Sequence, residues 1–267
     1  NKYNLSIRKT LEAIYENYKG DRNDKEFLAL ECYLKRVWFS NGIHHHYATD
    51  KFTPEFSENF FETTVRSLPS NTLPIQAYDN SVEKLIAAIK PVIFDSTLYA
   101  KRVNQNEDID LVKNSANNYY EGVSEAEVDQ YYNSKKDPND PMPISWGLNS
   151  KLMKENGNLV EKIWKIGGMY SDAIQKIVYW LEKASKVAEN EEQQRVINSL
   201  IDYYESGDLL TFDEYSILWV KDLDSRIDFI NGFIETYGDP LGLKASWESV
   251  VNFKDLEANS ANIKASS

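Results

Sequence analysis

The chain has 267 residues, and its 42 acidic and 30 basic side chains give a formal net charge of −12. This balance argues against a nucleic-acid-binding protein, which needs a positive surface to displace counterions from phosphates, and against docking to anionic membranes. No apolar run approaches the ~18 residues of a membrane span. The hydrophobic fraction of 42% is sufficient for a folded core. The single cysteine, Cys32, excludes an internal disulfide and is typical of a reducing compartment, which we interpret as the cytoplasm.

The N-terminal part of the chain is predicted to be helical, because apolar residues recur there at helical spacing with charged residues between them. The predicted helices span residues 5–18, 27–38, 58–67, 81–94 and 108–119. The second helix should end near Ser40-Asn41-Gly42. We expect Pro91 to end the fourth, since proline lacks the amide that continues a helix. Segment 68–74 is polar, is bounded by prolines and predicts a loop.

The middle of the chain contains one capped helix and one exposed loop. Ser124 and Glu127 stand at the spacing of a capping box, in which each side chain satisfies a backbone amide of the other, so a helix should begin here and end around Tyr132. Segment 135–143 contains three prolines, which exclude the interiors of both helices and strands. We interpret this segment as an exposed loop and as the best internal boundary of the chain.

The C-terminal part adds strands to helices. The dipeptide Asn156-Gly157 is typical of tight hairpins and predicts a β-hairpin with arms 144–154 and 159–166, with a helix as the alternative. Residues 227–237 are rich in aromatic and β-branched types, which favour a strand. Residues 259–267 are small and polar and indicate a frayed or truncated end. Further helices are expected over residues 174–187, from 191 to a stop at Gly207, and from a cap at Thr211. The predicted fold class is α+β, predominantly helical with a small antiparallel β component.

The only histidines of the chain are His44, His45 and His46. Successive residues of a helix point ~100° apart, so adjacent histidines on a helix cannot converge on one metal ion. On an extended strand His44 and His46 would share a face, and Asp50 or Glu55 could supply a carboxylate. We favour a polar, hydrogen-bonding loop over a metal site formed by this chain alone.

The sequence assigns no catalytic residue. It has no Gly-x-Ser-x-Gly elbow and neither of the glycine-rich phosphate-binding motifs. Cys32 falls in an apolar helix pattern and is expected to be buried and unreactive. Paired carboxylates are numerous, but in a chain with 42 acids their ordinary place is the solvated surface.

Two carboxylates interrupt the apolar run that begins at Ile227. Asp228 and Glu235 would be costly there unless each pairs with a cation. A carboxylate held on a rigid strand beside a groove is suited to binding an ammonium group. The alternative is an acid that faces outward from a half-exposed strand.

Three segments carry a resemblance to known proteins. The most specific runs from Trp219-Val220-Lys221-Asp222 through Asp228 to Gly232-Phe233-Ile234-Glu235-Thr236-Tyr237-Gly238-Asp239-Pro240-Leu241-Gly242. The others are Ser40-Asn41-Gly42 with Asp50-Lys51-Phe52-Thr53-Pro54, and Tyr179-Trp180-Leu181-Glu182-Lys183-Ala184. Together they resemble the dipeptidyl peptidase III family of zinc exopeptidases, most closely its bacterial, Bacteroides-like members.

The resemblance implies a two-lobed peptidase that removes dipeptides from the amino end of oligopeptides bound in a wide cleft. One lobe combines helices with a small β-barrel. The other holds zinc on a His-Glu-x-x-Gly-His helix, and this chain has no His-Glu pair. By resemblance, residues 1–245 are the N-terminal lobe and residues 246–267 begin the connection to the missing zinc lobe. The zinc then belongs to the full-length parent, with none in this chain, which should be inactive alone.

The resemblance also implies which residues contact the oligopeptide substrate. Asp228 falls where the family places an acid for the free amino group, and Ile230 falls where it often has a tyrosine. Asn41 and its neighbours should line the floor of the cleft, and the aromatic residues Tyr47 and Phe229 lie close to these segments in sequence. The rival interpretation is a complete, non-catalytic helical module that binds a peptide or a glycan.

Overall fold

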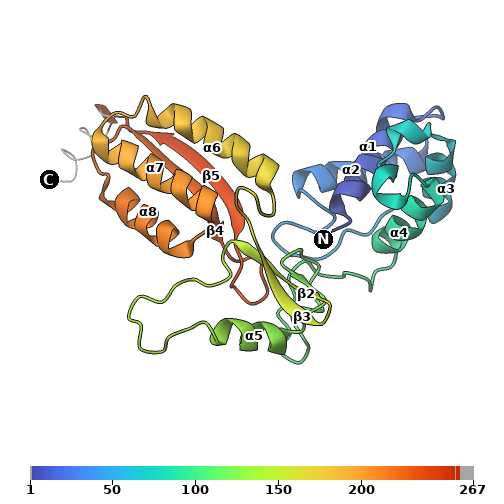
Figure 1. Cartoon of the computed structure of the whole chain (residues 1–267). Helices are drawn as coiled ribbons and strands as arrows, with labels where there is room; N and C mark the ends of the chain where they lie inside the picture. The colour runs from blue at the N-terminus through green and yellow to red at the C-terminus, as the bar shows by residue number, and fades with distance from the viewer. Residues whose placement is uncertain (1, 256, 259–267) are drawn as a thin grey trace. The chain divides into compact units, whose positions relative to one another are not determined.

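The structure, a computed structural model, describes residues 2–255 and 257–258 (Figure 1). The chain divides into two compact units, unit 1 with residues 1–118 and unit 2 with residues 119–267. The boundary therefore lies between Asn118 and Tyr119, and the expected boundary in segment 135–143 is wrong. That segment is the exposed loop that its prolines predict. The predicted frayed end, residues 259–267, lies outside the described residues.

Unit 1 is built from helices whose apolar faces form one core. The helices are α1 (Asn4–Asn17), α2 (Lys25–Phe39), α3 (Glu58–Ser67) and α4 (Val82–Phe94), with the short 3-10 turns η1 (Ser70–Thr72) and η2 (Ile75–Tyr78). Asp24, Ser57 and Ser81 each cap the helix that follows by accepting a hydrogen bond from an amide of its first turn. Fully buried side chains of this core include Ile7, Leu30, Leu34, Phe61 and Ile89. The helical spacing predicted for these segments is confirmed.

Pro91 does not end the fourth helix as expected. It lies inside α4, which continues to Phe94. The neighbouring Val92 and Ile93 are buried in the core of unit 1. Their burial holds the last turn in place although the proline cannot donate its backbone hydrogen bond.

Two further expectations for unit 1 are wrong. Residues 108–119 form turns instead of a helix, because the side chains of Asn106 and Asp110 accept hydrogen bonds from nearby backbone amides. Such local bonds offer the backbone an alternative to a helix. Cys32 is exposed and not buried. It lies beside Tyr33 on α2 but off the stripe of that helix that faces the core.

Unit 2 combines helices with two small sheets. Its elements in chain order are β1 (Tyr120–Glu121), α5 (Glu125–Asn133), β2 (Ser150–Glu155), β3 (Asn158–Ile163), α6 (Ser171–Ser185), α7 (Glu191–Ser206), α8 (Leu209–Lys221), β4 (Ile227–Glu235) and β5 (Ser246–Phe253). β2 and β3 are antiparallel, and β1 joins β2 in parallel to give a three-stranded sheet. β4 and β5 form a separate antiparallel pair, and α6, α7 and α8 lie beside it (Figure 1). Buried side chains of this core include Trp164, Val196, Leu200, Tyr204 and Phe233.

The local signals of unit 2 have clear structural counterparts. The capping box of Ser124 is present at the start of α5, and Asn156-Gly157 forms the turn between β2 and β3. The helix expected to begin with a cap at Thr211 is instead capped by Asp208, whose side chain accepts a hydrogen bond from the amide of Leu210 at 3.0 Å. Thr211 consequently lies within α8.

The fold class is α+β and predominantly helical, as predicted. The barrel implied by the resemblance is not confirmed, because the strands of the described residues form two separate sheets. Residues 246–253, which we assigned to the start of a connection, form β5 and pair with β4. That residues 1–245 are one lobe of a longer enzyme stays a prediction. Within the described residues, no helix combines the length and the apolar character needed to cross a membrane.

Candidate functional site

Asp228 lies near the start of β4, in the most specific of the three segments. Its Oδ1 accepts a hydrogen bond from the indole Nε1 of Trp219 in α8 at 3.0 Å. The side chain is half-buried, and in the described chain no Lys, Arg or His forms an ion pair with it. A half-buried carboxylate is stabilised by a cation beside it. The second carboxylate oxygen of Asp228 is therefore suited to accept a hydrogen bond from the ammonium group of a ligand.

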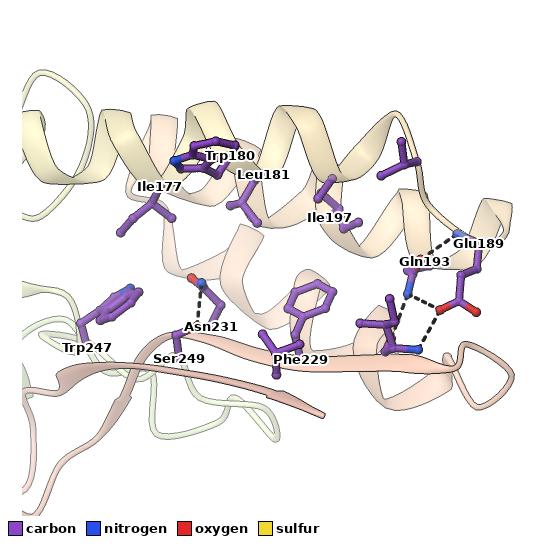
Figure 2. A pocket seen from close by; sticks show the side chains of 14 residues that line it. Ile177, Trp180, Leu181, Glu189, Gln193, Ile197, Phe229, Asn231, Trp247 and Ser249 are labelled. Atoms are coloured by element: carbon purple, nitrogen blue, oxygen red, sulfur yellow. Dashed lines mark hydrogen bonds between the residues drawn. The ribbon is translucent and has the colours of Figure 1, made fainter. Parts of the chain in front are cut away.

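The two faces of β4 have different character. Side chains alternate across a strand, so Asp228 and Ile230 lie on the face opposite Phe229. On the Phe229 face, a groove of about 440 Å³ separates the β4–β5 pair from α6 and α7 (Figure 2). Its walls are mainly apolar and include Trp180, Leu181 and Ile197 from the helices and Phe229, Trp247 and Val251 from the strands.

Polar residues fix the end of this groove at which β4 begins. The carboxylate of Glu189 accepts hydrogen bonds from the amides of Ile227 at 2.7 Å and Arg226 at 3.0 Å. Gln193 of α7 donates from Nε2 to the carbonyl oxygen of Ile227 at 2.9 Å (Figure 2). The bonds from the Ile227 and Arg226 amides lower the pKa of Glu189, so this carboxylate stays ionised and holds β4 in place. Its role at the groove is therefore structural.

A second set of hydrogen bonds fixes the opposite end of the groove. Trp247 donates from Nε1 to the hydroxyl oxygen of Tyr204 at 2.8 Å, and the Tyr204 hydroxyl donates to Oδ1 of Asn231. Asn231 in turn donates from Nδ2 to Oγ of Ser249 at 3.3 Å. Burial raises the pKa of Tyr204, which keeps this hydroxyl protonated. At each end of the groove, the polar groups form hydrogen bonds with their own neighbours. The groove therefore offers a ligand mainly apolar surface.

The turn after β4 is fixed by buried charged groups. Asp239 is buried, and its Oδ2 accepts hydrogen bonds from the hydroxyl of Tyr120 at 2.7 Å and from the amide of Lys244 at 2.8 Å. The fully buried Nζ of Lys244 donates to the hydroxyl oxygen of Tyr132 at 2.6 Å. Segment 239–242 thus has a structural role here: it ties the connection between β4 and β5 to β1 and α5.

The predicted cleft residues of unit 1 follow the end of α2. Asn41 adopts a left-handed conformation with φ of +50°, and Tyr47 is 85% exposed. Between them, His44 is buried with Nε2 2.8 Å from the carbonyl oxygen of Tyr99, and burial lowers the pKa of its imidazole to about 4. Nδ1 of His45 accepts the amide of Tyr47 at 3.2 Å. The histidines therefore organise a hydrogen-bonded loop that leaves Tyr47 exposed.

The predicted substrate-binding residues are distributed over both units. Asn41 and Tyr47 belong to unit 1, and the other three lie on β4 in unit 2. The structure does not bring these three to one face of the strand, because Phe229 lines the groove and Asp228 and Ile230 point the other way. Their roles in binding a substrate stay predictions.

Sequence reasoning missed two tryptophans of the groove. Trp180 of α6 is 68% exposed and Trp247 of β5 is 43% exposed, and both line the groove. Trp180 lies outside the buried stripe of α6, and an aromatic residue at such a position was the available signal. Trp247 had no comparable signal, since β5 itself was not predicted.

The residues present do not fit the zinc ion that the resemblance implies. Among the residues that the structure describes, no three or more His, Cys, Asp or Glu side chains gather closely enough to hold a metal ion. Ring nitrogens of His44 and His45 are used to hold their loop. The expectation that zinc belongs to another part of a longer protein continues to rest on the sequence, which has no His-Glu pair.

Comparisons with known proteins identify the family. The sequence pattern of Peptidase family M49 matches residues 95–265, which is more than half of the chain, and the chain belongs to this family. It is 31% identical over 101 residues to dipeptidyl peptidase 3 of Rattus norvegicus, a match that covers 37% of this chain and 14% of the rat protein. Dipeptidyl peptidase 3 of Nematostella vectensis is 21% identical over 91% of this chain and 37% of its own length.

Two solved structures are also longer than this chain. The structure of DPP III from Caldithrix abyssi matches 97% of this chain and 41% of its own, with a TM-score of 0.45 and 15% identity. That of dipeptidyl-peptidase III from Corallococcus sp. strain EGB also matches 97% of this chain and 41% of its own, with a TM-score of 0.43 and 14% identity. The chain thus spans less than half of the length of these relatives.

Proposed function

We propose that this chain is the substrate-binding N-terminal lobe of a zinc-dependent dipeptidyl peptidase, and that Asp228 holds the free amino end of an oligopeptide. The observation that carries the proposal is the carboxylate of Asp228. It is half-buried, and within the described residues its partner is an indole N–H and not a cation. The match to Peptidase family M49 covers residues 95–265 and therefore includes β4, which supports the proposal.

The environment of Asp228 suits an amino terminus. Because Trp219 occupies Oδ1, the other oxygen is available to an ammonium group, and such charge-assisted hydrogen bonds are stronger than neutral ones. Ile230 lies on the same face, directly across from Val250 of β5, which is 47% exposed. This pair gives an apolar surface for the first side chains of an extended peptide.

In this proposal the zinc ion and peptide hydrolysis belong to a part of the parent protein that this chain does not contain. The chain alone therefore binds peptides and does not cut them. A bacterial parent located in the cytoplasm is part of the same proposal, and the presence of a single cysteine, Cys32, supports the reducing location.

The test is calorimetric binding of tetra-alanine to the full chain, with a free or an acetylated amino end. We expect the free peptide to bind at least about tenfold more tightly than the acetylated one, as an ion-paired hydrogen bond would give. Asp228→Asn should abolish this preference, and the control Asp224→Asn, at an exposed neighbouring acid, should keep it. Equal binding of both peptides by the unaltered chain would contradict the assignment.

The apolar groove favours a second candidate function, that of a binding module for an apolar peptide or a glycan. Trp180 and Trp247 present the exposed aromatic surface that such ligands use. Under this alternative, Trp180→Ala should weaken binding of the acetylated peptide or of an oligosaccharide. The control Tyr179→Ala changes the preceding residue of α6, which does not line the groove. If Asp228→Asn weakens binding of the free peptide and Trp180→Ala does not, the result supports the peptidase lobe over the binding module.

A further inference from the structure

Unit 1 contains a pocket that none of the preceding roles uses. Its volume is about 580 Å³, and it lies between the last turns of α2 and the loop that follows this helix. Basic and aromatic side chains dominate its lining: Lys35, Arg36, Phe39, His45, His46 and Phe52. Ser40 and the exposed Cys32 complete it. Of the residues that the structure describes, no acidic one lines this pocket, although acids outnumber bases in the chain by 42 to 30.

Arg36 supplies the most available positive charge. Its nearest carboxylate is Glu55, 3.9 Å away, and both side chains are solvent-exposed, so this contact contributes little. The guanidinium donates no hydrogen bond within the described chain. Lys35 is less available, because Glu31 lies 2.9 Å from its Nζ. A planar guanidinium with open N–H groups matches the oxygens of a carboxylate or a phosphate.

His45 adds a directed donor. Nδ1 of His45 accepts the amides of Tyr47 at 3.2 Å and Ala48 at 3.0 Å, which places the ring proton on Nε2 and makes that nitrogen a donor. The ring of His46 stacks on that of His45 with centroids 4.8 Å apart. Nδ1 of His46 lies 3.3 Å from Oγ of Ser40. The loop therefore holds both imidazoles in fixed positions at the pocket.

The C-terminal end of α2 repels a bound anion only weakly. A helix C-terminus carries a partial negative charge of roughly half an elementary charge. Here the amides of Ser40 and Gly42 donate to the carbonyl oxygens of Arg36 and Val37 at 3.0 Å, so these oxygens already have partners. The full charge of Arg36 exceeds this partial charge.

We propose that this pocket binds the anionic group of a ligand, a carboxylate or a phosphate, with Arg36 as its principal partner and Nε2 of His45 as a second donor. The proposal is independent of the peptide-binding role of Asp228, which lies in the other unit. The aromatic side chains Phe39 and Phe52 would contact the part of the ligand next to its anionic group.

The test is a titration of the ¹⁵N-labelled full chain with inorganic phosphate at constant ionic strength, followed by NMR. We expect saturable shifts of the Arg36 side chain and of the amides of 40–46. Arg36→Gln should weaken binding about tenfold, at the lower end of what a hydrogen bond between charged groups contributes. The control Arg195→Gln, at an arginine of α7 whose side chain is 62% exposed, should leave the affinity unchanged. Both arginines are at the surface, and circular dichroism verifies that the two variants fold.

Competition distinguishes the two sources of the anionic group. Acetyl-Ala-Ala with a free carboxylate is added to the phosphate-bound protein, with the same peptide as its C-terminal amide for comparison. Displacement by the free acid alone assigns the pocket to a peptide carboxylate, and no displacement assigns it to phosphate groups. Unsaturable shifts scattered over surface lysines, or equal affinities for the unaltered and the Arg36→Gln proteins, would overturn the proposal.

Discussion

The Nζ of Lys244 lies 2.6 Å from the hydroxyl oxygen of Tyr132, and no carboxylate of the described residues forms an ion pair with this ammonium group. Its other hydrogen-bond acceptors are Oγ of Ser150 at 3.2 Å and the carbonyl oxygen of Gly147 at 3.3 Å. Burial lowers the pKa of Lys244 to about 8, although the more distant charges of Glu161 and Asp239 act in the opposite direction. A buried cation with only neutral partners costs free energy while it is charged.

This cost predicts an unusual dependence of stability on pH. The lysine titrates at 10.5 in its ordinary state and at about 8 in the folded chain, so the unfolded chain binds more protons between these values. The free energy of unfolding should therefore rise with pH above 8, by about 1 kcal/mol per pH unit, whereas the cost is fully present below 8. Urea unfolding of unit 2 at pH 7, 8 and 9 measures this rise.

The variant Lys244→Met provides the control for that prediction. It removes the titrating group and keeps an unbranched side chain of similar length in the buried position. We expect its stability to be nearly constant between pH 7 and 9. A rise equal to that of the unaltered protein would assign the effect to other groups.

His44 predicts a dependence of the same sign in acid, because its folded pKa is also lowered by burial. Its folded pKa of about 4 lies below the ordinary value of 6.5, so the unfolded chain binds more protons between these values. Stability should therefore fall as the pH is lowered from 6.5 towards 4. Relative to His44→Gln, the unaltered protein is expected to lose roughly 2 kcal/mol between pH 7 and pH 5. Using the difference between the two proteins cancels the shared titration of carboxylates, and a constant difference would contradict the prediction.

Two glycines with positive φ offer a matched comparison. Gly207 ends α7 with φ of +70°, and a Cβ there would lie 2.6 Å from Cγ2 of Ile163. Gly157, in the turn between β2 and β3, has φ of +83° and nothing within 4 Å of that position. Gly157→Ala should cost about 1 kcal/mol of backbone strain, and Gly207→Ala should cost about 2 to 4 kcal/mol because overpacking is added. Equal losses in urea unfolding would mean that Ile163 moves aside freely.

The proposed amine-binding role of Asp228 predicts a kinetic signature in the proposed full-length peptidase. Asp228→Ala should raise KM for oligopeptides at least about tenfold, because a charge-assisted hydrogen bond to the substrate is lost. The zinc content should stay the same, since Asp228 is no part of the proposed metal site. Steady-state kinetics with parallel metal analysis tests both statements, and an unchanged KM would remove the assignment.

Sequence patterns predicted the elements whose signals are local. The capping box at Ser124 and the turn at Asn156-Gly157 involve residues close in sequence, and both are present. The buried apolar faces of the main helices were also predicted correctly, because helical periodicity is a local signal. The errors at residues 108–119 and at Thr211 involved local hydrogen bonds that competed with the predicted pattern, whereas the error at Pro91 arose where distant packing decides. Pro91 remains helical because Val92 and Ile93 are buried against other helices.

The candidate site was predictable only in part for the same physical reason. The sequence singled out Asp228 by the cost of a carboxylate in an apolar run, but the partner that holds it, Trp219, comes from the preceding helix. The groove required β5, whose exposed Val250 and Val251 do not follow a strict alternation. The basic pocket required the loop of His45 to fold back on α2, which no periodic pattern indicates.

The pairing of β4 with β5 makes the two faces of β4 depend on one register. From Ile227 to Phe233 the pairing is regular, and the irregularity falls between Phe233 and Glu235. Deleting one residue from the regular part would turn Asp228 towards the groove and Phe229 towards the opposite face. A substitution can therefore change either proposed binding face by itself, whereas an insertion or deletion in the regular part changes both faces at once.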